Sequence, residues 1–318
     1  MSTVRSYLSL VKFSHTIFAM PFALIGFFLG VSSLRHHDFP ETYVRLPYPG
    51  QPGFRTGLAW TDAAMWLPLL PVFLLVIGCM VFARSAAMAF NRYLDRRFDA
   101  LNPRTAIREI PKGIITPGNA LAFTISCCLL FIACTYLINR VCFYLSPVAL
   151  AVVLGYSYTK RFTPLCHLVL GIGLALAPIG AYLAVTGCFH WLPLLFSGAV
   201  ICWVSGFDII YALQDVDFDT SQRLYSIPAA VGKARALRVS EGLHVISAGF
   251  VAIAGWRGEF GPLYWGGFAV FAGMLVYQHA IVKPDDLRRV NLAFMTANGI
   301  ASVVFAVFVI ADMMIGKA

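Results

Sequence analysis

Nine long apolar stretches are the feature of this sequence that most restricts its fold. A helix needs about 20 mostly apolar residues to cross the hydrocarbon core of a bilayer, so nine helices use about 180 residues of the chain. We therefore predict an all-α membrane protein, a bundle of nine transmembrane helices around a central cavity. The expected helices cover residues 16–33, 66–91, 118–138, 141–158, 165–187, 191–214, 236–256, 262–282 and 291–314.

The amino-acid composition excludes several other classes of protein. Charged residues make up 12% of the chain, whereas soluble domains contain about 25%, so a soluble two-domain enzyme and a nucleic-acid-binding module are both excluded. The eight cysteines lie almost entirely in apolar runs and lack C-x-x-C spacing. This pattern excludes a secreted disulfide scaffold and predicts small apolar side chains rather than metal ligands.

The distribution of positive charge predicts the orientation of the bundle. Of the 24 lysines and arginines, 17 lie in loops on the same side as the N-terminus, and six lie in the opposite loops or at the C-terminal end. By the positive-inside rule the N-terminus is cytoplasmic and the C-terminus is outside. The Pro-rich connection 34–62 is then an extracytoplasmic loop insertion on the membrane surface. Much of the net charge of +9 therefore reflects topology.

Two short acidic stretches at cytoplasmic helix ends are not explained by topology. They hold seven of the 15 carboxylates, with Glu109 as the last acid of the first stretch. Carboxylates near a bilayer usually face a protein interior or a wet cavity. Helical spacing places each set on one face, and Asp217 points away from that face. The first set is Asn91, Asp95 and Asp99; the second is Asp208, Tyr211, Asp215 and Asp219.

The chemistry of these stretches suggests a metal–diphosphate site. Stacked carboxylates repel unless neutralised, and Mg²⁺ often bridges one or two carboxylates to substrate phosphates. Nearby cations suit diphosphate oxygens. Asp95 and Asp215 are 120 residues apart with four expected helices between them, so a pseudo-repeat would bring them together across a central cavity. The basic neighbours are Arg92, Arg96, Lys160 and Arg161.

Two other interpretations remain open at this point. Arg92 with Asp95, and Arg96 with Asp99, have the i,i+3 spacing of ordinary surface ion pairs. Membrane acids also form ion pathways in ion-coupled transporters, although those acids usually lie near the middle of the membrane. His167 and Asn291 are more simply explained as structural hydrogen-bonding residues than as site residues.

The sequence resembles the UbiA superfamily of intramembrane aromatic prenyltransferases over nearly its whole length. The family's first motif, N-D-x-x-D-x-x-x-D, is matched from Asn91 to Asp99, with Arg92 where many members have aspartate. Its second motif, Y/D-x-x-Y-A-x-x-D-x-x-x-D, is matched from Asp208 to Asp219, and its basic segment is matched by YSYTKRFT at 156–163. The resemblance is strongest to a 4-hydroxybenzoate polyprenyltransferase-like branch that includes naphthoate prenyltransferases of menaquinone biosynthesis.

The resemblance implies a single domain over residues 1–318, in the cell inner membrane, with its site near the cytoplasmic face. Its partners would be the lipid bilayer and two substrates, with no nucleic acid and no obligate protein partner. The reaction would transfer a polyprenyl group from polyprenyl diphosphate to an aromatic acid such as 4-hydroxybenzoate in quinone biosynthesis, releasing pyrophosphate. Prenylation of 1,4-dihydroxy-6-naphthoate is the alternative within the family.

The resemblance also implies a role for particular residues. Metal ligands for Mg²⁺ would be Asn91, Asp95, Asp99, Asp215 and Asp219. Diphosphate ligands would be Arg84, Arg92, Lys160 and Arg161. Catalytic residues would be Asp208, Tyr211 and Arg161, with the first two steadying the allylic cation or orienting the acceptor. His15, near the start of the first expected helix, would contact the acceptor.

Overall fold

The computed structural model describes residues 3–11, 18–35 and 60–315, and its regular structure over these ranges is helical. Most of the 34–62 connection and His15 lie outside the described residues. Short helices at one end of the bundle are α1 (Thr3–Leu10), η3 (Leu213–Asp215), α8 (Val216–Ser221) and α9 (Ile227–Val231). The long helices are α2 (Met20–Arg35), α3 (Ala63–Leu101), α4 (Pro117–Ile138), α5 (Arg140–Thr159), α6 (Cys166–Thr186), α7 (Trp191–Ala212), α10 (Lys233–Arg257), α11 (Pro262–Ile281) and α12 (Asn298–Ile315).

These long helices match the nine apolar stretches, and together they confirm an all-helical membrane protein. Within the described ranges, seven helices are long and apolar enough to cross a membrane. The other two long helices are α2, which is shorter, and α11, which falls outside those seven. A count of nine transmembrane helices and a cytoplasmic N-terminus stay predictions.

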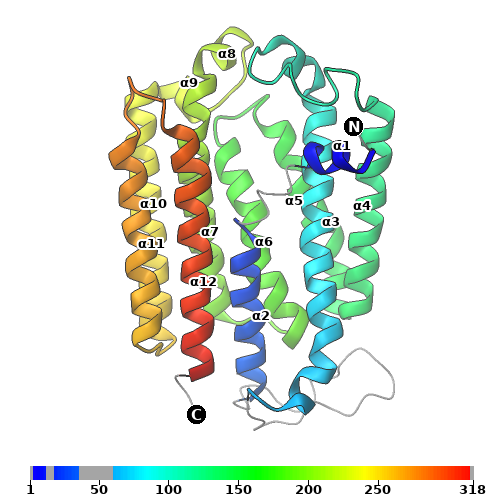
Figure 1. The fold of residues 1–318 in the computed structure, drawn as a ribbon, viewed down its shortest axis with the longest axis vertical. Coiled ribbons are helices and arrows are strands. Elements are labelled where there is room, and N and C mark those ends of the chain that lie inside the picture. The colour runs from blue at the N-terminus through cyan, green and yellow to red at the C-terminus, as the bar shows by residue number, and fades with distance from the viewer. Residues whose placement is uncertain (1–2, 12–17, 36–59, 316–318) are drawn as a thin grey trace.

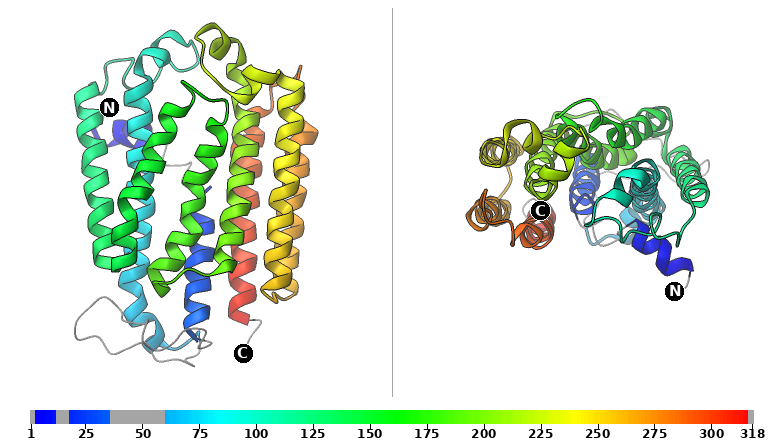
Figure 2. Two further views of the ribbon diagram at one scale, coloured as in Figure 1. Left: turned by 180° about the vertical axis from the view of Figure 1, so that it is seen from behind. Right: turned by 90° about the horizontal axis from the view of Figure 1, so that it is seen from above.

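Successive long helices run in opposite directions along the long axis of the molecule (Figure 1). One end, at the top of Figure 1, carries α1, the connection 102–116 after α3, and the short helices α8 and α9; we call it the polar end. Helix α12 finishes at the opposite end. Seen along that axis, α2 lies between α12 and α3 (Figure 2). Because α3 and α7 both run toward the polar end, the acidic motifs at the ends of these two helices lie at the same end of the bundle.

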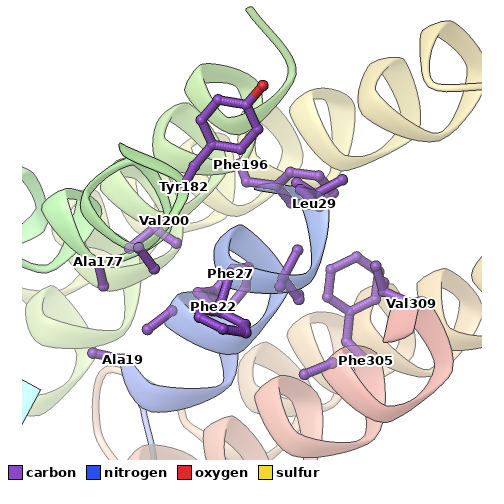
Figure 3. Close-up of a cluster of buried hydrophobic side chains, with 14 of the residues drawn as sticks. Ala19, Phe22, Phe27, Leu29, Ala177, Tyr182, Phe196, Val200, Phe305 and Val309 are labelled. Atoms are coloured by element: carbon purple, nitrogen blue, oxygen red, sulfur yellow. The ribbon is translucent and has the colours of Figure 1, made fainter. Parts of the chain in front are cut away.

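An aromatic cluster packs the centre of the bundle on the α2 side (Figure 3). The ring of Phe22 lies 5.2 Å from that of Trp203 and 6.1 Å from that of Phe305, between centroids. Helix α2 also approaches α6 closely, since a Cβ on Gly26 would lie 2.0 Å from the carbonyl oxygen of Pro178. Small residues permit such backbone approach between membrane helices, where packing replaces the hydrophobic effect as the driving force.

A buried polar network fixes a short π-helix, η4 (Leu292–Ala297), that precedes α12. The side-chain oxygen of Asn298 accepts hydrogen bonds from Trp203 Nε1 at 2.8 Å and Gln278 Nε2 at 2.9 Å. Its Nδ2 donates to the Phe294 carbonyl at 3.0 Å. A π-helix is a rare and often functional interruption, and here the network sets the position of the Phe294 ring.

Helix α1 anchors the connection 102–116 at the polar end. Leu10 of α1 packs with Ile110 and Ile115 in a small apolar cluster, and Ser9 donates a hydrogen bond to Glu109. Glu109, which belongs to the first acidic stretch, thus serves to tie α1 to this connection.

Candidate active site

A cavity of about 290 Å³ opens among α3, α5, α6 and α7 near the polar end. Both acidic motifs line it, as the pseudo-repeat predicted. Its charged lining residues are equal in number, five of each sign. The acids are Asp95, Asp99, Asp208, Asp215 and Asp219, and the cations are Arg84, Arg92, Arg104, Arg108 and Lys160.

The first motif lies on α3 because that helix continues past its apolar part into the polar sequence. Asp95, 2% exposed, accepts contacts from Lys160 Nζ at 2.5 Å and Arg161 Nη2 at 3.4 Å. Asn91 Nδ2 also donates to Asp95, at 3.3 Å. Lys160 and Arg161 follow the end of α5, so the ion pairs of Asp95 connect α3 to the end of α5.

The next carboxylate of the first motif, Asp99, has a different partner. One oxygen accepts a hydrogen bond from Arg108 Nη1 at 2.6 Å. The other, Oδ2, is buried and has no hydrogen-bond partner in the described part of the chain. The interpretation of the motif as local ion pairs with Arg92 and Arg96 is therefore wrong, because both acids pair with residues outside the helix.

The second motif bends away from the axis of α7 and meets the connection 102–116. Asp215 Oδ1 accepts hydrogen bonds from Arg104 Nε at 3.0 Å and Asn102 Nδ2 at 3.3 Å, and Oδ2 forms an ion pair with Arg104 Nη2. Arg104 Nη1 also donates to the Tyr211 hydroxyl at 2.9 Å. Burial alone would lower the pKa of Arg104, but Asp215 and Tyr211 outweigh it, so this pKa lies above its ordinary value.

Asp219 completes the motif by accepting a hydrogen bond from the Ser226 hydroxyl at 3.0 Å. Ser226 is the N-cap of α9, where its hydroxyl also accepts from the Ala229 amide. The cap therefore fixes the position of the side chain that holds Asp219. Asp217, between the two motif acids, is exposed and lies outside the cavity lining, as its helical position predicted.

Half-buried Asp208 of α7 pairs with buried His167 of α6. The His167 Nδ1 atom lies 2.7 Å from Asp208 Oδ2, and the Ile227 amide donates to His167 Nε2 at 3.4 Å. We assign a proton to Nδ1, which donates to Asp208. Both residues line the cavity.

Two cavity arginines keep buried nitrogens without a hydrogen-bond partner among the described residues. They are Nε of Arg84 and both Nε and Nη1 of Arg92. Arg92 is only 3% exposed, so its charge is withdrawn from solvent into the lining. Unpaired buried donors are costly, and here they face a cavity that an anion could enter. Unpaired donors and a bare carboxylate oxygen on Asp99 together fit a metal–diphosphate pair.

A second, apolar cavity of about 360 Å³ continues from the first toward the opposite end of the bundle. The two cavities share lining residues on α3, α5 and α6: Arg84, Met88, Tyr156, Leu170 and Leu174. Aliphatic and small side chains line most of the remaining surface, with Gly173 and Gly180 on the α6 wall. The geometry therefore offers a polar compartment joined to an apolar one, with Arg84 at the boundary.

Comparison with known proteins identifies the family. A model of the UbiA prenyltransferase family matches residues 55–300. The chain belongs to the UbiA prenyltransferase family. It is 29% identical over 255 residues to the 4-hydroxybenzoate octaprenyltransferase of Tolumonas auensis, covering 78% of this chain and 89% of that one. The enzyme of the same description from Nitrosospira multiformis is 30% identical over 244 residues, covering 77% and 84%.

Solved structures share the fold. A UbiA homologue from Aeropyrum pernix K1 superposes with a TM-score of 0.71 at 28% identity, covering 96% of this chain and 98% of that one. A UbiA homologue from Archaeoglobus fulgidus, bound to GPP and Mg²⁺, has a TM-score of 0.64 at 18% identity, covering 98% and 100%. Membership of the UbiA prenyltransferase family makes this chain a prenyltransferase enzyme and an integral membrane protein, and it sets aside the ion-coupled transporter.

The structure brings together nearly all the site residues predicted from the UbiA motifs. Arg161 contacts Asp95 but does not line the cavity. His15 lies outside the described residues, so its contact with the acceptor stays a prediction. Asn291 is exposed and outside the lining, whereas the prediction of a structural role for His167 missed its place beside Asp208. Residues that the sequence analysis did not assign to the site are Asn102, Arg104, Arg108, Ser226 and Phe294.

A sequence signal existed for only some of these missed residues. Arg104 and Arg108 stand in the run NPRTAIR directly after the first UbiA motif, but they were counted only as topological charges. Phe294 is one of 26 phenylalanines, and only the fold distinguishes it: its ring lies 4.3 Å from the Tyr211 ring, between centroids, at the cavity wall.

Proposed function

We propose that this enzyme transfers a polyprenyl group from polyprenyl diphosphate to an aromatic acid of the 4-hydroxybenzoate class and releases pyrophosphate. The observation that carries the proposal is the single cavity lined by both acid motifs and by unpaired arginine nitrogens, continuous with an apolar cavity. The first compartment suits a diphosphate and the second suits an isoprenoid chain. The names of the Tolumonas and Nitrosospira relatives state the same reaction class.

The proposed metal ligands are the oxygen-bearing residues of the two motifs. They would hold Mg²⁺, which prefers carboxylate and amide oxygens together with substrate phosphates. When bound, the metal would neutralise charge that develops on the departing diphosphate. The unpaired Asp99 Oδ2 atom supports this assignment because a buried carboxylate oxygen needs a partner. The proposed ligands are Asn91, Asp95, Asp99, Asp215 and Asp219.

The proposed diphosphate ligands are cations at the wall of the polar compartment. Arg84 and Arg92 offer unpaired nitrogens, while Lys160 and Arg161 already lie beside Asp95. Guanidinium groups bind phosphate oxygens in bidentate fashion, and these hydrogen bonds are stronger where water is excluded. These residues would orient the donor and stabilise the pyrophosphate as the bond between the prenyl carbon and the diphosphate oxygen breaks. Arg161 would contribute to that stabilisation as a catalytic residue.

Asp208 and Tyr211 face the prenyl carbon in the proposed arrangement. The bond electrons leave with pyrophosphate, and the resulting allylic cation is attacked by a ring carbon of the acceptor. The Asp208 carboxylate would steady that cation and could then accept the ring proton, since one of its oxygens remains free of the hydrogen bond to His167. The Tyr211 ring, tilted against that of Phe294, would orient the acceptor and offer a π-face to the cation.

The identity of the acceptor is the finer part of the proposal. A panel of 4-hydroxybenzoate, 1,4-dihydroxy-6-naphthoate and homogentisate, each with one polyprenyl diphosphate, would measure it directly. We expect turnover with 4-hydroxybenzoate, the acceptor in the relatives' names. Turnover with the naphthoate alone would replace this acceptor.

The metal site has a matched set of variants. Asp95→Asn and Asp215→Asn should each lower Mg²⁺-dependent pyrophosphate release at least about 100-fold, because each removes a carboxylate that would hold the metal, and the metal neutralises the charge on the leaving group. Asp217→Asn changes the same residue type on the exposed side of α8 and should leave the rate unchanged. Equal rates in all three variants would reject the proposed reaction at this site.

A further inference from the structure

Two arginines of the connection 102–116 form ion pairs with carboxylates that the proposed function assigns to metal. Arg104 pairs with Asp215 through two nitrogens, and Arg108 Nη1 lies 2.6 Å from one oxygen of Asp99. One acid comes from each motif, and both arginines come from the same short segment. Each of these two carboxylates, which the proposed function assigns to metal, is thus paired with a guanidinium group.

Metal and these two arginines would compete for the same carboxylates. The aspartates of the cavity lining and its lysine and arginine side chains are equal in number, five of each. Divalent metal on Asp99 and Asp215 would bring two positive charges beside a guanidinium group within a few ångströms, and such a contact is strongly repulsive where water is scarce. A diphosphate entering with the metal supplies the oxygens that the displaced guanidinium groups need.

Only the side chains have to move. The backbone of the connection is fixed by the Thr105 hydroxyl, which donates to the Asp99 carbonyl at 3.1 Å, and by the Arg104 amide, which donates to Asn102 Oδ1 at 3.0 Å. The side chains of Arg104 and Arg108 are 33% and 21% exposed and line the cavity. A long flexible side chain on a fixed backbone can exchange one anionic partner for another nearby.

We propose that Arg104 and Arg108 are diphosphate-binding residues that exchange partners. Without substrate they neutralise Asp215 and Asp99. Once metal occupies these carboxylates, both guanidinium groups bind diphosphate oxygens. The inference rests on the proposed function, and it adds a consequence: metal alone binds weakly because it must displace an arginine, whereas metal and diphosphate bind cooperatively because the displaced arginine gains a new partner.

The test measures Mn²⁺ binding to the purified full-length protein by the EPR signal of free Mn²⁺, with and without saturating inorganic pyrophosphate. The same titrations without protein correct for the Mn²⁺ that pyrophosphate itself chelates. Arg104→Gln keeps a hydrogen-bond donor for Asp215 but removes the charge. We expect it to tighten Mn²⁺ binding about tenfold without pyrophosphate, and to reduce the tightening that pyrophosphate causes by a similar factor. Arg108→Gln should change both quantities in the same directions.

The control is Arg97→Gln, which removes an exposed cation of α3 outside the cavity lining and should change neither quantity. If Arg104 and Arg108 served only to hold the site in shape, their loss would weaken Mn²⁺ binding instead of tightening it. Unchanged or weaker Mn²⁺ binding by the variants without pyrophosphate overturns the inference. Wild-type protein that binds Mn²⁺ under neither condition would overturn the proposed metal site as well. Thermal unfolding of each variant confirms that the comparison is made on folded protein.

Discussion

Replacing Arg92 with methionine separates a substrate-binding arginine from a structural one. Arg92 is 3% exposed, and two of its nitrogens have no hydrogen-bond partner among the described residues. A buried charge without a partner destabilises a fold, so an apolar side chain of similar length should leave the melting temperature unchanged or raise it. The same substitution should damage donor binding, because it removes two donors that face the cavity.

The size of the loss follows from those two nitrogens. A hydrogen bond to a charged group contributes about 1.5–3 kcal/mol, so losing two costs at least about 3 kcal/mol. That value corresponds to at least about 100-fold in kcat/KM for the polyprenyl diphosphate. The assay is steady-state pyrophosphate release with varied donor, alongside thermal unfolding. Arg97→Met, on the exposed side of the same helix, is the matched control. A lower melting temperature with unchanged kcat/KM would refute the reasoning.

Three further predictions concern packing, the apolar cavity and the acid beside the cation. Gly26→Ala should lower the melting temperature, because its Cβ would lie 2.0 Å from the Pro178 carbonyl oxygen and overpacking costs about 1–3 kcal/mol; Gly249→Ala, with nothing within 4 Å, should not. Gly173 lines the apolar cavity, and a Cβ at this position would meet open space, so Gly173→Leu should fill part of the cavity and lower the ratio of kcat/KM for long over short prenyl diphosphates about tenfold. Unchanged chain-length preference would place the prenyl chain elsewhere. Asp208→Asn should lower kcat about 100-fold without changing Mn²⁺ affinity in the EPR titration, and weaker Mn²⁺ binding would instead make Asp208 a metal ligand.

The helices could be predicted from hydropathy, but their functional ends could not. Expected and observed boundaries agree closely for Pro117–Ile138 and Arg140–Thr159. Helix α3 instead continues ten residues beyond its expected end at 91, to Leu101. Apolar content stops where a helix leaves the membrane, whereas backbone hydrogen bonding does not. The π-helix before α12 has no hydropathy signal, since a buried network across three helices holds it.

The candidate site shows a similar division. Regular spacing within one helix correctly placed Asp95 and Asp99 on a common face and Asp217 away from its neighbours. Contacts between helices were beyond that reasoning, because no periodicity links Asp99 to Arg108 or Asp215 to Arg104. Residues of one element can be assigned to a face from sequence, but their counter-charges depend on how the connections fold back.

The most direct test of the account is the position of the metal. Crystals of the full-length enzyme with Mn²⁺ and a non-cleavable prenyl diphosphate analogue would reveal manganese by its anomalous scattering. We predict manganese density bounded by Asp95 and Asp99 on one side and by Asp215 and Asp219 on the other, with the diphosphate between them. A diphosphate bound in the cavity with no manganese on either pair of carboxylates would contradict the central claim.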